Sequence, residues 1–363
     1  MVAATRERPG LRGLAGAVVL LVLAQALVGA QSVAEALPLT SVQAHIGLGV
    51  ALLATHWGLY LGSAPARSGA NVSLRALGRE IVALTKPRIS AMVIATFGGG
   101  LWLAPQSQET WKGLVALLGT LLIVGAANAL NMYLERDIDG RMKRTRNRPL
   151  PQGRLSADAA VATGTALLCT SLPLMLLGGN ALTCILGFVA FASYVFLYTP
   201  LKQKSSVALF VGAVPGALPP LMGWTTATGR MDAPGLVLFG ILFLWQIPHF
   251  LAISVFRAEE YSRAGFKVMP AEQGMRQTRA WALACAVAMV LVSLALRPLG
   301  VSGWLYTSAA ALLGAGFVAW TAAGYRLANR EGAGAARWGR SLFGASILYL
   351  MLLFTALAVD HLL

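Results

Sequence analysis

Residues 128–151 read NALNMYLERDIDGRMKRTRNRPLP, and this stretch joins an apolar segment to a strongly basic one. On a continuous helix Asn131, Glu135 and Asp139 are four residues apart, so their side chains are offset by about 40° and share one face, which Asn128 joins three residues earlier. Carboxylate and amide oxygens bind Mg²⁺, whereas Arg and Lys side chains bind phosphate oxygens. The stretch therefore indicates a site for a divalent metal and a phosphorylated ligand. The alternative is a solvated helix end followed by a basic loop, which is common in membrane proteins.

The composition of the whole chain is typical of an integral membrane protein. Of its 363 residues, 57% are hydrophobic and only 12% are charged, and the mean hydropathy is +0.67. Repeated apolar runs of about 20 residues match the thickness of a bilayer core. Cys169, Cys184 and Cys285 all lie in apolar runs without metal-ligand spacing, so they predict neither a disulfide framework nor a metal site.

We predict an all-α, polytopic membrane protein with about eleven transmembrane helices. An amino-terminal hairpin and a polar linker, residues 1–75, precede a nine-helix body, residues 76–363. The linker composition extends over residues 64–88, which we expect to lie in the cytoplasm. The predicted spans are 14–30, 41–63, 89–105, 113–135, 157–177, 181–199, 206–226, 234–256, 277–297, 301–322 and 341–360. Since three arginines precede the first span, a cleaved signal peptide ending near Ala30 is an alternative for that span.

The formal charge of +15 is explained by membrane topology. If the amino terminus is cytoplasmic, only Lys112, Arg230 and Arg297 lie outside, and the other 26 of the 29 basic residues lie inside. This asymmetry supports the order of the spans and argues against nucleic acid as a partner. We therefore expect a protein of the bacterial cytoplasmic (inner) membrane, surrounded by lipid, with its site facing the cytoplasm.

A second polar helix end follows the span 234–256, on the same predicted side of the membrane as the first. It contributes His249, Glu259 and Glu260, and the loop that contains Tyr198 and Lys202 lies between the two ends in the sequence. Two acidic clusters ringed by basic side chains suit the ionisation of a diphosphate: Mg²⁺ bridges its oxygens, and Lys and Arg neutralise the leaving group. The apolar body would hold a lipid tail and exclude water.

These motifs resemble the signatures of the UbiA-type intramembrane prenyltransferases, and more specifically of their haem o synthase branch (protohaem IX farnesyltransferase). The resemblance covers about residues 76–363. It rests on the segments NMYLERDID (131–139), MKRT (142–145), RPL (148–150), YTPLK (198–202), Gly212–Trp224 and WQIPHF (245–250). The branch usually has Asp-Asp-Tyr where this chain has Glu259–Glu260–Tyr261, and glutamate keeps the charge but adds one methylene group to the side chain.

The resemblance implies nine core helices around a cavity that opens laterally to lipid. It also implies Mg²⁺-dependent transfer of a farnesyl group from farnesyl diphosphate to a vinyl carbon of protohaem (haem b), for haem-copper oxidase biogenesis. The implied metal ligands are Asn131, Glu135 and Asp139, with Glu259 and Glu260 near a second ion. The implied diphosphate ligands are Lys143, Arg144, Arg148 and Lys202, and the implied pocket residues are Asn128, Tyr133, Tyr198 and Trp245. His249 is placed with the catalytic residues, either against haem or in the second metal cluster, with a structural hydrogen bond as the alternative.

Residues 25–53 also resemble a helix pair of haem a synthase. Under this interpretation His45 is a haem ligand, or the hairpin docks a haem a synthase partner; the alternative is an interhelical hydrogen bond.

Two rival functions remain for the body. The first is a prenyltransferase of quinone or chlorophyll synthesis, although the Asn-Asp start and the later Asp typical of that branch are absent. The second is a transporter, although a transporter would place ionisable residues near the membrane midplane, and here they lie at helix ends.

Overall fold

The computed structural model describes residues 74–105, 109–326 and 333–363, and the elements within these ranges are helices. They are α3 (Leu74–Thr85), α4 (Pro87–Leu103), α5 (Thr110–Leu134), α6 (Arg136–Asp139), α7 (Ala157–Gly178), α8 (Ala181–Ala192), the π-helical η1 (Ser193–Tyr198), α9 (Thr199–Leu201), α10 (Ala208–Thr228), α11 (Ala233–Phe256), α12 (Ala258–Ala264), α13 (Met269–Glu272), α14 (Gly274–Leu294), α15 (Trp304–Arg326) and α16 (Ala333–Leu362). The predicted hairpin, its signal-peptide alternative and His45 lie outside the described residues.

The nine spans predicted for the body correspond to nine successive helical segments. These segments are α4, α5, α7, α8 with η1 and α9, α10, α11, α14, α15 and α16. Eight helices of the described chain are long and apolar enough to cross a bilayer, and α4 makes a ninth if it is counted together with α3, from which it is bent by 54°. The all-α membrane fold is thus confirmed, and the two remaining spans of the predicted eleven fall in residues 1–73, which are not described.

The interpretation of residues 64–88 as a linker is wrong from Leu74 onward, because residues 74–85 form the helix α3. Leu84 is fully buried and packs in a cluster with Ala129, Met132 and Tyr133 of α5. The polar composition that suggested a linker therefore belongs to an amphipathic helix with one apolar face on the bundle.

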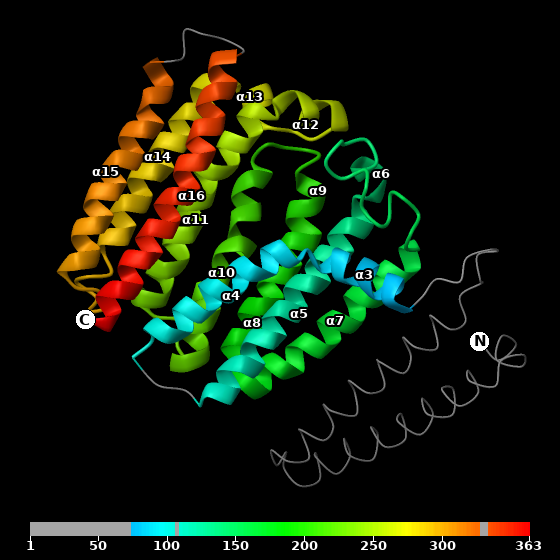
Figure 1. Cartoon of the computed structure of the whole chain (residues 1–363), viewed down its shortest axis with the longest axis horizontal. Coiled ribbons are helices and arrows are strands. Elements are labelled where there is room, and N and C mark those ends of the chain that lie inside the picture. Colours follow the sequence, from blue (N-terminus) through cyan, green and yellow to red (C-terminus); the bar gives the residue numbers. More distant parts are fainter. Residues whose placement is uncertain (1–73, 106–108, 327–332) are drawn as a thin grey trace, which may run out of the picture.

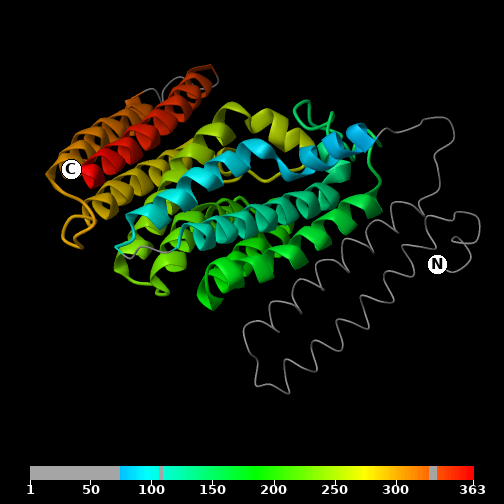
Figure 2. The ribbon, with the colours of Figure 1, turned by 60° about the horizontal axis from the view of Figure 1, so that its bottom comes forward.

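The helices pack side by side in one bundle (Figure 1). Helix α5 packs against α7, α10 packs against α4, and α11 lies among α10, α14 and α16. In the view of Figure 2, α15 and α16 form the edge of the bundle opposite α7. The buried apolar side chains form two large clusters. One contains Phe97, Ile123 and Met175, and the other contains Ile241 and Met289.

The two ends of the bundle differ in charge and in structure. The short helices α6, α9, α12 and α13 gather at one end (Figure 1). Three basic residues lie at the other end of the bundle. Lys112 is in the first turn of α5, Arg230 lies between α10 and α11, and Arg297 follows α14. Most of the charged side chains of the bundle thus lie at the end with the short helices.

Helices α4 and α10 approach each other closely at two glycines. A Cβ atom on Gly100 would overlap the carbonyl oxygen of Pro220, and one on Gly223 would overlap the carbonyl oxygen of Phe97. Small residues at helix contacts allow the backbones to approach in a membrane, where packing rather than hydrophobicity drives association. This contact fixes α4, whose first turn reaches the pocket described below.

Gly100→Ala is expected to destabilise the bundle by about 1–3 kcal/mol, because the added methyl group can be accommodated only if the backbones separate. Gly99→Ala is the matched control, because a Cβ atom there meets nothing within 4 Å. Thermal unfolding in detergent, followed by light scattering, compares the two variants. Equal melting temperatures for the two variants would contradict this account.

Candidate functional site

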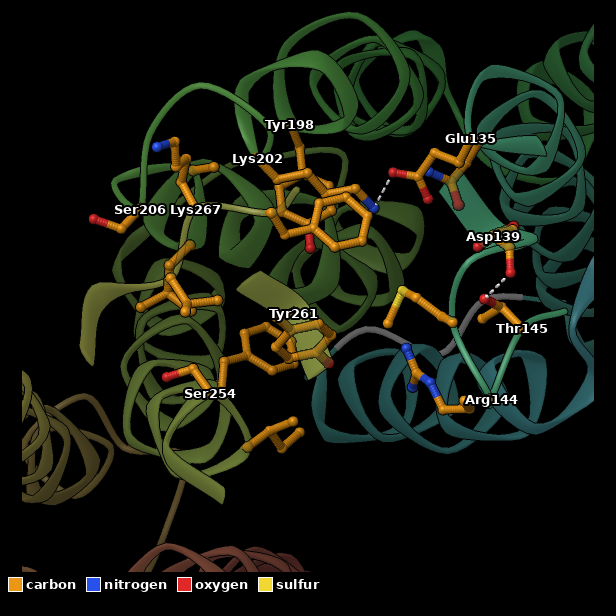
Figure 3. A pocket seen from close by; sticks show the side chains of 18 of the residues that line it. Glu135, Asp139, Arg144, Thr145, Tyr198, Lys202, Ser206, Ser254, Tyr261 and Lys267 are labelled. Carbon is orange, nitrogen blue, oxygen red and sulfur yellow. Dashed lines mark hydrogen bonds and ion pairs between the residues drawn. The ribbon is translucent and has the colours of Figure 1, made fainter. Parts of the chain in front are cut away.

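A cavity of about 440 Å³ opens at the end of the bundle that carries the short helices. Its polar wall comes from α5, α6 and the loop that follows them, and its other walls come from η1, α9, α11 and the α12–α13 region. Figure 3 shows Glu135 and Asp139 on one side of the cavity, with Lys202 and Tyr198 beside them and Tyr261 facing them. We refer to this cavity as the carboxylate pocket.

The two carboxylates of the pocket are buried, and their alignment survives a break in the helix. Helix α5 ends at Leu134, and Glu135 has φ −103° and ψ 4°, so the continuous helix assumed from the sequence is interrupted. The amide of Glu135 still donates to the carbonyl of Asn131 (3.0 Å), and that of Asp139 still donates to the carbonyl of Glu135 (2.8 Å). Because these bonds keep a spacing of four residues, the three side chains remain on one side and all line the pocket.

Each buried carboxylate is paired with a cation. Nζ of Lys202 forms an ion pair with Oε1 of Glu135. Nη1 of Arg148 donates to Oδ2 of Asp139 at 2.6 Å. The two side-chain carboxylates are only 3% exposed, and removal of one partner of such a pair leaves an uncompensated buried charge. Both carboxylates of the wall are therefore charge-compensated, and the wall as a whole keeps an excess of basic side chains.

Lys202 is held as a cation by its surroundings. Burial alone would lower the pKa of Lys202, but Tyr198 and Glu135 outweigh it and raise this pKa above its ordinary value. The ammonium lies 5.0 Å from the ring centre of Tyr198 and 5.1 Å from that of Phe266. The carbonyl of Lys202 accepts a hydrogen bond from the amide of Lys267, which ties α9 to the α12–α13 region.

Lys86 is a pocket residue that the sequence analysis missed. Its Nζ donates to Oδ1 of Asn131 at 3.1 Å, and Nδ2 of Asn131 donates to the hydroxyl of Thr199 at 3.1 Å. Lys86 has φ 52° and is the one non-glycine residue with positive φ in the described part of the chain. The only sequence signal was a lysine directly before a proline at the start of an apolar span, and it gave no hint of a partner 45 residues away.

Other predicted residues also line the pocket. Arg144 and Tyr198 do so, as the resemblance implied. Several further residues of the wall had no predicted site role, although two of them lie in the quoted motifs; they are Thr145, Tyr194, Ser206, Ser254, Phe250, Phe266 and Lys267. Tyr261 is of most interest, because burial raises the pKa of its hydroxyl and it faces the acidic wall across the cavity (Figure 3). The hydroxyl therefore remains protonated and can donate a hydrogen bond.

The structure does not bring Glu259 and Glu260 into the pocket, contrary to the expected second acidic cluster. Glu259 pairs with Arg263 one turn along α12 and is exposed, and Glu260 pairs with Arg257 at 2.7 Å. Consecutive helix residues are separated by about 100°, so when Tyr261 faces the cavity the two residues before it point elsewhere. Within the described ranges, no three His, Cys, Asp or Glu residues form a group suited to a metal ion.

Four further predicted residues are not on the pocket wall. The exposed Lys143 projects from the basic loop, and Asn128 is buried, with its amide donating to the carbonyl of Thr85 at 3.3 Å. The guanidinium of Arg136 lies over the ring of Tyr133, with its Cζ atom 4.6 Å from the centre of that ring. Trp245 donates from Nε1 to the carbonyl of Ser346 at 2.7 Å.

His249 also lies off the pocket wall, between α11 and α16. Its Nδ1 is 2.8 Å from the hydroxyl of Ser346, and its ring packs against those of Trp245 and Phe343. This contact with Ser346 is a structural hydrogen bond of the kind predicted as the alternative role of His249.

The donor set of the pocket fits a hard divalent cation that also binds a ligand. Asn131, Glu135 and Asp139 supply one amide oxygen and two carboxylates from one side of the cavity. Mg²⁺ usually binds proteins through one or two carboxylates and completes its coordination with water and phosphate oxygens. Three protein donors facing an open cavity match this pattern.

The chain matches a known protein family. The model of the UbiA prenyltransferase family matches residues 92–358. The chain belongs to the UbiA prenyltransferase family. It is 49% identical over 294 residues to a protein named protoheme IX farnesyltransferase from Anaeromyxobacter sp. (strain Fw109-5), covering 81% of this chain and 97% of that protein. A protein of the same name from Myxococcus xanthus (strain DK1622) is 48% identical, with coverage of 80% and 97%.

Solved structures of the UbiA family share the fold. One of digeranylgeranylglyceryl phosphate synthase superposes with a TM-score of 0.66 at 17% identity, covering 78% of this chain and 98% of that one. A UbiA homolog from Archaeoglobus fulgidus bound to DMAPP and Mg²⁺ superposes with a TM-score of 0.56 at 15% identity, with coverage of 77% and 99%. At such identities the likeness concerns the arrangement of helices, and this bundle is therefore a UbiA-type prenyltransferase fold.

Proposed function

We propose that this membrane enzyme transfers a farnesyl group from farnesyl diphosphate to a vinyl group of protohaem IX (haem b), and so makes haem o. The observation that carries the proposal is the carboxylate pocket, where two buried carboxylates and at least three cations meet below an apolar wall. Relatives at 48–49% identity that are named protoheme IX farnesyltransferase support the choice of substrates.

The reaction exchanges a carbon–oxygen bond for a carbon–carbon bond. The bond between C1 of the farnesyl group and the diphosphate breaks, and the terminal vinyl carbon of haem forms a new bond to C1. Water then adds to the other vinyl carbon, which leaves a hydroxyl group there and releases one proton. The products are haem o, diphosphate and a proton.

The leaving diphosphate is stabilised by the cations of the pocket. Lys202 and Arg148 exchange their carboxylate partners for diphosphate oxygens, and Lys86 and Arg144 approach from the neighbouring wall. Arginine can bind two phosphate oxygens at once, whereas lysine acts as a point charge. Asn131, Glu135 and Asp139 would hold Mg²⁺, which neutralises charge developing on the diphosphate.

The rest of the wall suits the hydrocarbon part of the reaction. Leu209, Leu251 and Ile253 provide apolar surface for the prenyl chain. The ring faces of Tyr198 and Phe266, which already contact the ammonium of Lys202, can also stabilise positive charge on the allylic carbon. A wall of this kind excludes water until the carbon–carbon bond has formed.

The proposed setting is the bacterial inner membrane, with the pocket on the cytoplasmic side and haem-copper oxidase biogenesis as the destination of the product. The charge asymmetry supports this orientation, because Lys112, Arg230 and Arg297 lie at the end away from the pocket. Residues 1–73 provide a candidate docking element for a haem a synthase partner. Deletion of residues 1–70, followed by activity and co-purification assays, tests this element separately from the body.

The proposal is tested by incubation of the purified full-length protein with haem b, farnesyl diphosphate and Mg²⁺, followed by mass spectrometry of the extracted haem. We expect the mass of the haem to increase by one farnesyl group and one hydroxyl group. Addition of a chelator should prevent the reaction, and renewed Mg²⁺ should restore it. If the protein instead prenylates an aromatic acid and leaves haem unchanged, the proposal is wrong.

Lys86→Met is expected to raise the KM for farnesyl diphosphate about tenfold, the equivalent of about 1.4 kcal/mol for a lost charge-assisted contact. Lys112→Met, at the opposite end of the bundle, is the control. Initial rates at saturating haem separate KM from kcat. An unchanged KM for farnesyl diphosphate would remove Lys86 from the diphosphate site.

A further inference from the structure

His249 occupies an aromatic surface next to the carboxylate pocket. Its ring lies 4.7 Å from that of Trp245, at an interplanar angle of 24°, and 4.8 Å from that of Phe343. Phe250, which follows it in α11, lines the pocket, and the two rings have centroids 5.7 Å apart. One ring therefore separates His249 from the cavity.

The hydrogen bonds of Ser346 determine which nitrogen of His249 carries the proton. The hydroxyl of Ser346 lies 2.7 Å from the carbonyl oxygen of Phe343, and since a carbonyl has no proton, Ser346 must donate there. The same hydroxyl oxygen lies 2.8 Å from Nδ1 of His249, so it accepts and Nδ1–H donates. In the neutral ring Nε2 is then the nitrogen with the free lone pair.

No other group in the described part of the chain competes for the free nitrogen. Among the described residues, Nε2 of His249 has no hydrogen-bond partner, and this atom is not completely buried. Meanwhile Ser346 is fully buried, and its carbonyl accepts from Nε1 of Trp245 at 2.7 Å. The serine thus fixes both the tautomer and the neighbouring ring, an arrangement that is typical of metal-binding histidines, whose second nitrogen is held by another group.

We propose that Nε2 of His249 is an axial ligand of the haem iron while haem is bound as the acceptor substrate. This inference rests on the proposed function, which supplies a flat, iron-containing acceptor. The iron gains one Fe–N bond and loses a bound water if one is present, and no proton is released because Nε2 is already unprotonated. Phe250 and Phe343 contact the macrocycle, whose vinyl edge then points past Phe250 into the pocket.

The chain contains four histidines, which allow a matched comparison. Full-length protein is loaded with haem b without farnesyl diphosphate, and the iron–imidazole stretch of the ferrous form is recorded by resonance Raman spectroscopy. We expect the stretch in the wild type and in the His45→Ala, His56→Ala and His361→Ala variants, and its loss in His249→Ala. The Kd for haem should rise at least about 100-fold in His249→Ala and about tenfold in Ser346→Ala.

A second variant protects the test from misfolding. His249→Gly leaves space for free imidazole, which should restore both the stretch and farnesyl transfer to haem. In His249→Ala, kcat/KM for haem should fall while the KM for farnesyl diphosphate stays constant. Glu135→Gln should keep the iron–imidazole stretch, since that residue belongs to the diphosphate site.

The outcomes separate the inference from the proposed function. If wild-type protein farnesylates haem but shows no iron–imidazole stretch, or keeps it in His249→Ala, the axial ligand is wrong and the proposed function stands. If wild-type protein does not farnesylate haem at all, the proposed function is wrong. Loss of the stretch in His45→Ala or His56→Ala instead would place the haem in the amino-terminal segment and overturn the inference.

Discussion

Glu135→Gln is expected to abolish farnesyl transfer while leaving the protein folded in the membrane. The amide of the new glutamine can still accept a hydrogen bond from Lys202, but the substitution removes one of the two carboxylates that face the cavity. Loss of a ligand to a metal that stabilises the leaving group is worth roughly 4 kcal/mol, or a fall in kcat of about 10³-fold. Single-turnover assays with mass spectrometry of the haem measure the loss.

The matched control for this variant is Asp137→Asn. Asp137 belongs to the same acidic stretch, but its side chain is 82% exposed and lies outside the pocket. It should retain wild-type turnover, and Asp139→Asn should behave like Glu135→Gln. Near-normal turnover in Glu135→Gln would refute the metal assignment.

Lys202→Met should have two separable effects. It leaves Glu135 as a buried, unpaired carboxylate, which costs about 3–5 kcal/mol of stability. It also removes a cation from the leaving group, so we expect kcat/KM for farnesyl diphosphate to fall about 10²-fold. Thermal unfolding and initial rates measure the two effects independently.

The double variant Lys202→Met with Glu135→Gln distinguishes these causes. With the carboxylate neutralised, stability should return toward that of the wild type, whereas activity should not. Lys204→Met changes an exposed lysine in the same loop and should leave both quantities unchanged. If Lys204→Met lowers kcat/KM as strongly as Lys202→Met, general electrostatics rather than a specific contact is responsible.

Apolar length and charge placement were sufficient to predict the helices of the body. Each predicted body span has a counterpart among the long helices because the bilayer imposes both length and composition. Asn131, Glu135 and Asp139 share one face as predicted, since local hydrogen bonds maintain their spacing through the break at Glu135. Such features depend on residues that are close in the sequence. Asn128 was predicted on the same face, but its amide bonds to the carbonyl of Thr85 instead.

The parts that the sequence did not predict depend on contacts between distant segments. Lys86 reaches Asn131 only because α3 and α4 fold over the end of α5. At the second helix end, the motif led to Glu259 and Glu260, but the rotation of α12 after the break at Arg257 presents Tyr261 instead. A shift of one residue is below the accuracy of a predicted helix boundary.

The ion pairs of the carboxylate pocket also bear on how the proposed reaction would end. In the proposed reaction, Lys202 and Arg148 move from Glu135 and Asp139 to the diphosphate, and they pair with these carboxylates again when it departs. The departing anion is thus replaced by internal counter-ions, so the cations are never left bare in a dry cavity, a state that would cost several kcal/mol. Under the proposed function, the same two carboxylates would therefore act at both stages, as metal ligands while diphosphate is bound and as counter-ions of Lys202 and Arg148 once it has left.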